Sequence, residues 1–170
     1  GGRCGVVVPN GMLFGDGVCA RIKEDLLRDF NLHTIVRLPK GVFAPYTGIE
    51  TNLLFFEHGG PTKEIWYYQV QLPEGRNTYT KTKPMKFEEY APVLAWWKNR
   101  TTNEQAWKVS VDIILENNFN LDIKNPNAAK TDEHREPEDI VTGIVEREQR
   151  IIMLMQKIQA EIGKDWGNAE

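Results

Sequence analysis

The sequence predicts an α/β fold with a mixed sheet, parallel in its first part and antiparallel at its edge, followed by a helical C-terminal region. In the first seventy residues, short runs of β-branched and aromatic residues alternate with one segment of helical spacing. Near the C-terminus, a long apolar stripe at helical spacing follows a charged, non-periodic stretch. The first pattern indicates sheet strands, and the second indicates a long amphipathic helix.

The composition predicts a globular protein that is neither membrane-spanning nor secreted. The 170 residues are 41% apolar and 26% charged, with a net charge of -3 that disfavours a globally basic nucleic-acid binder but allows a local basic patch. No apolar run is long enough to span a membrane, and the two cysteines lack metal-ligand spacing, so we expect a reduced, cytoplasmic protein. A strand follows the first residues at once, without an initiator Met, so we expect a piece of a longer protein.

The first elements predict a strand–helix–strand unit. Residues 4–8 form a continuous apolar run, typical of a strand buried on both faces. Residues 18–30 have apolar positions at helical spacing, with Asp16 as a possible N-cap. Residues 32–38 form a second β-branched strand. Short connections predict that the two strands are parallel and joined by a right-handed crossover.

Two more strands follow, separated from the second by a loop rich in Gly, Pro and Thr. Residues 52–57 form the third strand and residues 64–72 the fourth. The short turn at 58–63 favours an antiparallel pair.

The remaining segments are mainly helical. We expect a helix at 87–99, a helix at 111–116 with Ser110 as its N-cap, and a short strand at 120–123. A charged linker at 126–136 precedes the longest helix, at 137–162. The stripe of that helix either folds back on its own domain or joins another chain; its positions include Ile140, Ile144, Ile151, Met155 and Ile158.

The sequence contains few standard catalytic motifs. His33, His58 and His134 lie far apart without metal spacing, and no serine stands in a nucleophile elbow. The glycines at 11, 15 and 17 lack the spacing of a nucleotide-binding fingerprint. We therefore assign no catalytic, cofactor-binding or metal-binding residue within this chain.

Two segments leave alternatives open. Residues 76–86 interleave four basic residues with Tyr79, which suits either a solvated loop or a set of contacts to nucleic-acid phosphates. Phe43, in the loop between the second and third strands, is either a core aromatic or a stacking face for a flipped-out base. From the residues alone, the core interpretation of Phe43 is favoured.

Several motifs resemble one known family over nearly the whole chain. They are GGRCGVVVPNGMLF at 1–14, LPKGVF at 38–43 and TGIETNLLFF at 47–56, with weaker agreement at IWYY (65–68), KTKP (81–84) and NLDI (120–123). In this order they resemble the modification (M) subunits of type I restriction–modification systems, which are adenine-N6 DNA methyltransferases.

The resemblance implies the distal half of a Rossmann-like methyltransferase sheet in residues 1–72. It further implies S-adenosylmethionine as the cofactor of the intact protein and the N6 atom of adenine in double-stranded DNA as its target. Phe43 matches the aromatic that stacks on the flipped adenine, and further DNA contacts are expected at Lys40, Tyr46, Arg76, Lys81 and Lys83. The family's Gly-rich cofactor loop and its Asn-Pro-Pro-aromatic tetrapeptide are absent, so this stretch alone is not expected to methylate DNA.

The resemblance also implies an assembly role for the C-terminal part. Residues 73–125 are a mixed loop and helix extension, 126–136 a linker, and 137–163 a helix for docking onto the DNA-specificity (S) subunit. A second M subunit and the restriction (R) subunit are the other expected protein partners. The alternative for this chain by itself is a non-catalytic assembly module.

Overall fold

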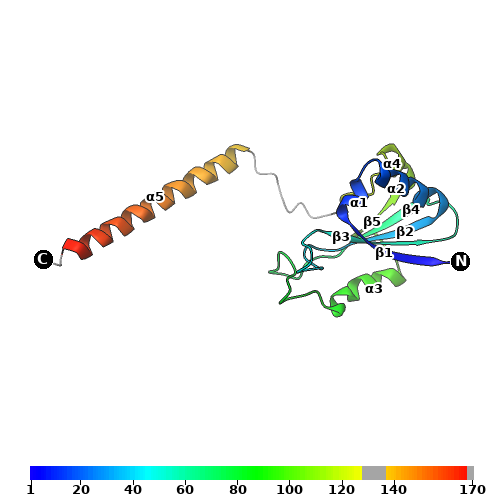
Figure 1. Cartoon of the computed structure of the whole chain (residues 1–170), viewed down its shortest axis with the longest axis horizontal. Coiled ribbons are helices and arrows are strands. Elements are labelled where there is room, and N and C mark those ends of the chain that lie inside the picture. Colours follow the sequence, from blue (N-terminus) through cyan, green and yellow to red (C-terminus); the bar gives the residue numbers. More distant parts are fainter. Residues whose placement is uncertain (128–136, 168–170) are drawn as a thin grey trace. The chain divides into compact units, whose positions relative to one another are not determined.

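The computed structural model describes the backbone of residues 1–127 and 137–167, and the side chains of 1–127 and 141–159. The chain separates into two units, Gly1–Ala129 and Lys130–Glu170, and each is described by itself (Figure 1). Most of the predicted linker at 126–136 lies outside the described residues. None of the described helices combines the length and the apolar content that a membrane span requires.

A sheet with helices makes up the first unit, and the described part of the second unit is one helix. In chain order the elements are β1 (Arg3–Pro9), α1 (Asn10–Phe14), α2 (Val18–Asp29), β2 (Asn31–Arg37), β3 (Thr51–Glu57), β4 (Glu64–Gln69), η1 (Phe87–Tyr90), α3 (Ala91–Lys98), β5 (Ala106–Ser110), α4 (Val111–Glu116) and α5 (Pro137–Gly167). The predicted helices at 87–99 and 137–162 are thus confirmed, the first as η1 followed by α3.

The sheet has five strands in the order β1-β3-β2-β4-β5. β3 lies between β1 and β2 and is antiparallel to both, β2 and β4 are parallel, and β5 is antiparallel to β4. The first two strands, β1 and β2, run in the same direction as predicted, although β3 lies between them. The expected pairing of the third and fourth strands is wrong, because β2 separates them. The chain reverses direction between β2 and β3, and β3 forms its hydrogen bonds with the edge of β2 that faces β1.

β1 is an edge strand, so the prediction that it is buried on both faces is wrong. Nearly all of its residues are exposed, with Val7 at 51%. Its single neighbour is β3, which leaves the other edge without a partner among the described residues. The β-branched composition indicates a strand correctly, but it does not say whether a second strand and a covering helix are present.

Helices cover both faces of the sheet (Figure 1). Leu13 of α1, Leu27 of α2 and Ile114 of α4 pack in one core cluster with Ile35 of β2. Val93 and Trp96 of α3 pack in a second cluster on the opposite face. Successive residues of β2 point into different clusters, as the alternation of a strand requires.

α2 is oriented differently from the prediction. Val18 and Ile22 of the predicted apolar stripe are 67% and 49% exposed, whereas Lys23 is buried. The Lys23 ammonium donates to the carbonyl oxygens of Leu13 (2.8 Å) and Gly15 (3.0 Å), and so satisfies carbonyls at the end of α1. Burial lowers the pKa of Lys23. The predicted Asp16 cap is wrong as well, because α2 begins after Gly17 with no side-chain cap.

The region after α3 completes the sheet. Residues 106–110, expected in a mixed segment, form strand β5. Ser110 caps α4 as predicted, its hydroxyl oxygen accepting from the Asp112 amide at 3.4 Å. The expected strand at 120–123 is wrong: this segment has no strand partner. It is fixed by single hydrogen bonds instead, such as that from the Leu121 amide to the Leu13 carbonyl (3.0 Å).

Candidate functional site

The loop at 38–50 leaves the sheet at the end of β2 and returns at the start of β3. The Leu38 amide donates to the Thr51 carbonyl oxygen (3.0 Å) and closes the base of the loop, and the Asn10 amide of α1 donates to the Glu50 carbonyl oxygen (2.9 Å). Inside the loop, the Tyr46 amide donates to the Phe43 carbonyl at 3.0 Å. The loop therefore has a defined conformation with a closed base.

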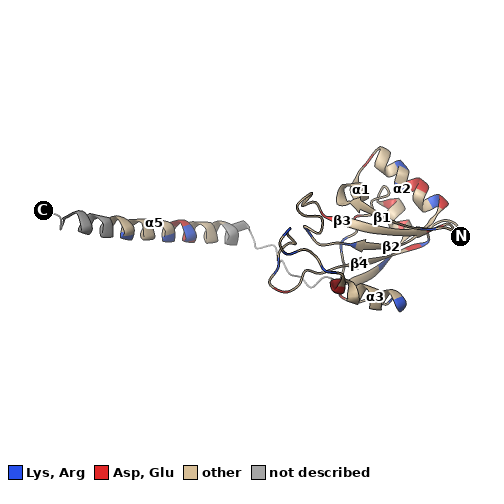
Figure 2. Cartoon of the chain, turned by 60° about the horizontal axis from the view of Figure 1, so that its bottom comes forward, with Lys and Arg blue, Asp and Glu red and all other residues tan. Residues whose placement is uncertain are grey.

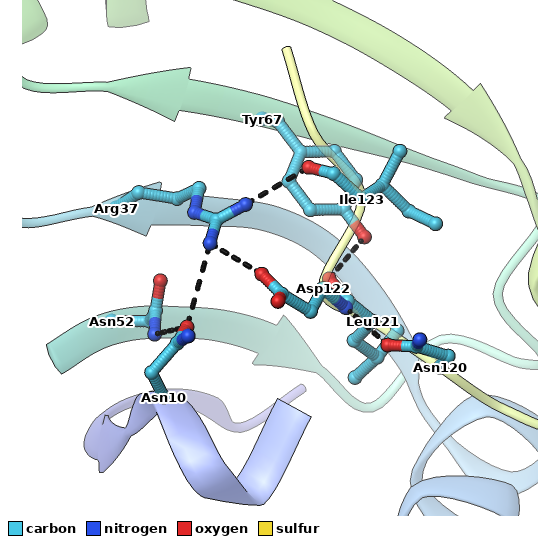
Figure 3. A network of polar contacts seen from close by, with 8 residues as sticks. All are labelled: Asn10, Arg37, Asn52, Tyr67, Asn120, Leu121, Asp122 and Ile123. Atoms are coloured by element: carbon cyan, nitrogen blue, oxygen red, sulfur yellow. Dashed lines mark hydrogen bonds and ion pairs between the residues drawn. The ribbon is translucent and has the colours of Figure 1, made fainter. Parts of the chain in front are cut away.

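A polar cluster, which we call the Arg37 clamp, fixes that base (Figure 3). Arg37 forms an ion pair with Asp122 and donates to the Ile123 carbonyl oxygen at 2.9 Å. The Asn10 side-chain oxygen accepts from Arg37 at 3.4 Å and from Asn52 at 3.1 Å. Arg37 directly precedes the loop and Asn52 lies just after it, so the clamp joins both ends of the loop to segment 120–123.

Segment 120–123 is itself held in place. The Tyr67 hydroxyl donates to the Leu121 carbonyl oxygen at 3.1 Å, and the Asp122 amide donates to the Asn120 side chain at 2.8 Å. Burial raises the pKa of Tyr67, so the phenol keeps its donor proton at neutral pH. The clamp was missed from sequence because its members come from distant positions and show no common spacing.

The loop at 38–50 interlocks with the basic segment at 76–86. The Lys40 carbonyl oxygen accepts from the Tyr79 amide (3.0 Å) and from the Thr78 hydroxyl (3.1 Å). The Tyr79 ring is buried and its hydroxyl donates to Glu89. Burial, together with this hydrogen bond, raises the pKa of Tyr79 to about 12. Tyr79 is therefore a structural anchor between the two loops and offers no free stacking face.

Gly41 allows the close approach of these loops, and its replacement should separate them. Its φ is +83°, and an added Cβ would lie 2.3 Å from the Tyr79 carbonyl oxygen. We expect Gly41→Ala to destabilise the chain by about 3 kcal/mol, because both the backbone conformation and the contact become strained. Urea unfolding measures this, with Gly48→Ala as the control, since a Cβ there meets nothing within 4 Å. Equal midpoints for the two variants would contradict the interlock.

The predicted DNA-contact residues lie on these two loops. Phe43 is 38% exposed and belongs to neither core cluster, so the core interpretation favoured by the residues alone is wrong. Tyr46 is 93% exposed, and Lys40, on the same loop, is exposed as well. Lys81 lies within the tight turn that joins Thr80 and Lys83, and both lysines are exposed.

Arg76 differs from the other basic residues. It is half-buried, with its guanidinium carbon 5.8 Å from the centre of the Tyr79 ring. Its Nη1 atom is buried without a hydrogen-bond partner among the described residues. The basic segment is thus partly packed against the fold and is not simply a solvated loop.

The second unit presents the predicted stripe to solvent. Within the described part of α5, Ile144, Ile151, Met155 and Ile158 are between 51% and 58% exposed. The side chain of Ile140 lies outside the described residues. Figure 2 shows charged residues interrupting the uncharged ones along α5.

The described residues do not fit S-adenosylmethionine. A hollow of about 310 Å³ between α3 and the sheet is lined almost wholly by apolar side chains, which cannot bind ribose hydroxyls. A polar cleft of about 460 Å³ is lined by Lys63 and Arg100, whose charges disfavour the sulfonium cation. Among the described residues, His, Cys, Asp and Glu side chains form no group of three that could hold a metal ion.

Comparison with known proteins identifies relatives that match nearly the whole chain. The chain is 48% identical over 169 residues to the Type I restriction enzyme EcoEI methylase subunit of Escherichia coli, a match that covers 95% of this chain and 34% of the relative. It is 36% identical over 101 residues to the EcoKI methylase subunit of E. coli strain K12, covering 54% of this chain and 18% of the relative. The chain thus spans about a third of the length of the EcoEI subunit.

Solved structures agree with the sequence relatives. A modification subunit of a putative type I restriction enzyme from Vibrio vulnificus is 59% identical, with a TM-score of 0.73 over 78% of this chain and 29% of that chain. A chain from a study of complex assembly and conformational transition of the type I R-M system is 38% identical, with a TM-score of 0.73 over 99% of this chain and 36% of that chain. The family model for N-6 DNA methylases matches residues 1–135. This chain therefore belongs to the N-6 DNA methylase family.

Proposed function

We propose that this chain is the distal part of an S-adenosylmethionine-dependent methyltransferase that methylates adenine N6 in DNA within a type I restriction–modification complex. The observation that carries the proposal is the exposed Phe43 on a loop whose base is clamped, in a chain of the N-6 DNA methylase family. The cofactor supplies the methyl group, and residues outside this chain bind the cofactor. The residues described above hold the target base and the DNA backbone.

In this proposal Phe43 stacks on the flipped adenine. A base must leave the duplex before its exocyclic amine can react, and an aromatic face compensates for part of the lost stacking. The Arg37 clamp and the Tyr79 anchor reduce the freedom of the loop, so less entropy is lost when the base binds.

Contacts to the DNA backbone are proposed for Lys40, Tyr46, Arg76, Lys81 and Lys83. They lie on two loops that touch through the Lys40 carbonyl oxygen, so they form a local basic patch on a chain with a net charge of -3. Such contacts position the duplex without reading its sequence. The DNA sequence would be read by the specificity subunit.

The sheet of the longer protein is proposed to continue beyond β1, as the distal-half assignment requires. Two facts support this. β1 has one strand neighbour and is exposed on both faces, and the EcoEI relative is about three times as long. Unpaired edges of this kind are normally covered or paired in the complete fold.

The activity is tested on the full-length protein in complex with its specificity subunit. Incubated with unmethylated DNA and S-adenosylmethionine labelled in the methyl group, the complex should transfer label to adenine N6. Label on cytosine only, or labelling that needs no target site, would exclude this function.

The second proposed role is assembly, carried by the exposed stripe of α5. A partly apolar helix face is stable in water when another surface covers it, and the specificity subunit is the proposed partner, alongside a second M subunit and the restriction subunit. This assignment places the protein in the cytoplasm, where such a complex meets the DNA.

Two added charges on the stripe should abolish this association. We expect the double variant Ile151→Lys/Met155→Lys to lose binding to the specificity subunit in a pull-down or by calorimetry, because the interface would bury two unpaired charges. The control is Gln149→Lys/Gln156→Lys, which adds the same charge on the opposite side of the helix at 100° per residue. Binding that survives the first variant, or is lost equally in both, would rule out the stripe as the interface.

A further inference from the structure

A polar cleft lies at the end of the sheet opposite the loop at 38–50. It is lined by residues near the start of β2, in the turn before β4 and after α3, including His33, Lys63, Glu64, Trp66 and Arg100. The loop at 38–50 follows the last residue of β2, whereas His33 is near the first. The cleft is therefore separate from the proposed base-binding site.

Arg100 is the most unusual residue of this cleft. Its guanidinium carbon lies 4.5 Å from the centre of the Trp97 ring, which fixes the guanidinium plane against the protein. No carboxylate forms an ion pair with Arg100 or Lys63 in residues 1–127 or 141–159. Burial lowers the pKa of Arg100, while Glu57 opposes that change. A half-buried guanidinium is thus held in position without an ion-paired carboxylate from the described part of the chain.

The nearby carboxylates are engaged elsewhere. Glu64 pairs with Lys108 at 2.9 Å, and Glu57 accepts a hydrogen bond from Asn31 at 3.4 Å. Neither is within ion-pair distance of Arg100. The cationic groups of the cleft therefore remain available to a ligand.

His33 adds a third donor. Both terminal nitrogens of Arg100 lie 3.5 Å from its Nδ1 atom, and the Thr34 hydroxyl lies 2.8 Å from the same atom. A guanidinium can only donate, so Nδ1 accepts and the proton of the neutral imidazole is on Nε2. Burial and the charge of Arg100 lower the pKa of His33, against an opposing effect of Glu57.

The cleft is preformed. Its turn at 58–63 is fixed by Thr62, whose hydroxyl accepts from the Leu32 amide and donates to the Phe30 carbonyl, both at 2.8 Å. The Thr62 amide donates to the Leu27 carbonyl at 2.8 Å. Little rearrangement is needed for a ligand to bind.

We propose that this cleft binds a phosphate group through Arg100, Lys63 and His33. A guanidinium matches phosphate oxygens in geometry and charge, and the ammonium and imidazole supply further donors. The volume of about 460 Å³ exceeds that of one phosphate, so the ligand carries the phosphate on a larger body. Two sources share this chemistry: a free phosphomonoester and the phosphodiester backbone of DNA.

Calorimetry of the 170-residue chain with inorganic phosphate, and separately with a blunt DNA duplex, tests the proposal at constant ionic strength. Arg100→Gln should weaken phosphate binding about tenfold, the effect of one charge-assisted hydrogen bond. Lys63→Gln should also weaken it, and the stability of the chain should change little because the Lys63 side chain is exposed. Arg21→Gln, an exposed charge on α2 outside the cleft, is the control and should leave binding unchanged.

The outcomes separate the two sources. If Arg100→Gln weakens the binding of phosphate but not of DNA, the ligand is a free phosphomonoester. If Arg100→Gln weakens the binding of both, the ligand is the DNA backbone. The pKa of His33, followed by NMR, should rise when phosphate binds, because a nearby anion favours the imidazolium form. Absence of phosphate binding, an unchanged His33 pKa, or equal losses in the Arg100→Gln and Arg21→Gln variants would overturn the proposal.

Discussion

Phe43→Ala in the full-length protein should lower the rate of adenine methylation by about ten- to hundredfold. Stacking of a base on an aromatic side chain contributes about 1–3 kcal/mol, and in the proposed site this energy would hold the flipped adenine in place. The stability of the chain should change little, because Phe43 belongs to neither core cluster. Single-turnover methylation with saturating cofactor measures the effect.

Phe43→Trp is the matched control, since it keeps an aromatic face on the same loop. It should retain most of the methylation rate, whereas Phe43→Leu, which is apolar but not aromatic, should behave like the alanine variant. An unchanged rate in Phe43→Ala would remove Phe43 from the site. An equal loss in the tryptophan variant would indicate that the side chain only shapes the loop.

Arg37→Met should destabilise the chain by about 2–3 kcal/mol, because it leaves Asp122 poorly solvated without its cationic partner. The two side chains are only 17% and 26% exposed, so solvent screens the ion pair much less than it screens a surface pair. The bond from Arg37 to the Ile123 carbonyl oxygen is lost as well. Urea unfolding gives the stability, and hydrogen exchange at residues 38–50 reports the loosened loop.

The double variant Arg37→Met/Asp122→Leu should recover part of that stability, since no unpaired charge remains. Arg28→Met is the control: it breaks the exposed contacts of Arg28 to Asp25 and Asp29, and should have little effect. A stability loss in Arg37→Met no larger than in Arg28→Met would show that the clamp does not hold the loop.

The sequence was sufficient for the elements whose patterns are local. The apolar runs of β2 and β3, the Ser110 cap of α4 and the stripe of α5 are all contained within a few neighbouring residues. Strand pairing was not predictable in the same way, because a short connection limits distance but does not say which edge of β2 is taken by β3. β3 therefore lies between β1 and β2, and it does not pair with β4 as expected.

The site was predictable only in part. The motif around Phe43 indicated the loop through its resemblance to a family, whereas composition and spacing alone favoured the wrong, buried placement. The buried Lys23 contradicts the average behaviour of lysine, and its partners are backbone carbonyls that leave no sequence pattern. The Arg37 clamp joins residues up to 86 positions apart, which no local pattern reveals.

Photo-crosslinking tests the central claim, that Phe43 contacts the target base, most directly. A duplex carrying 5-iodouracil in place of the target adenine is bound to the full-length protein with its specificity subunit and irradiated. Trypsin should then release the peptide of residues 41–63, which follows Lys40 and ends at Lys63, with the nucleotide attached to Phe43. A crosslink to a residue outside the loop at 38–50, formed in good yield while Phe43 stays unmodified, would contradict the account.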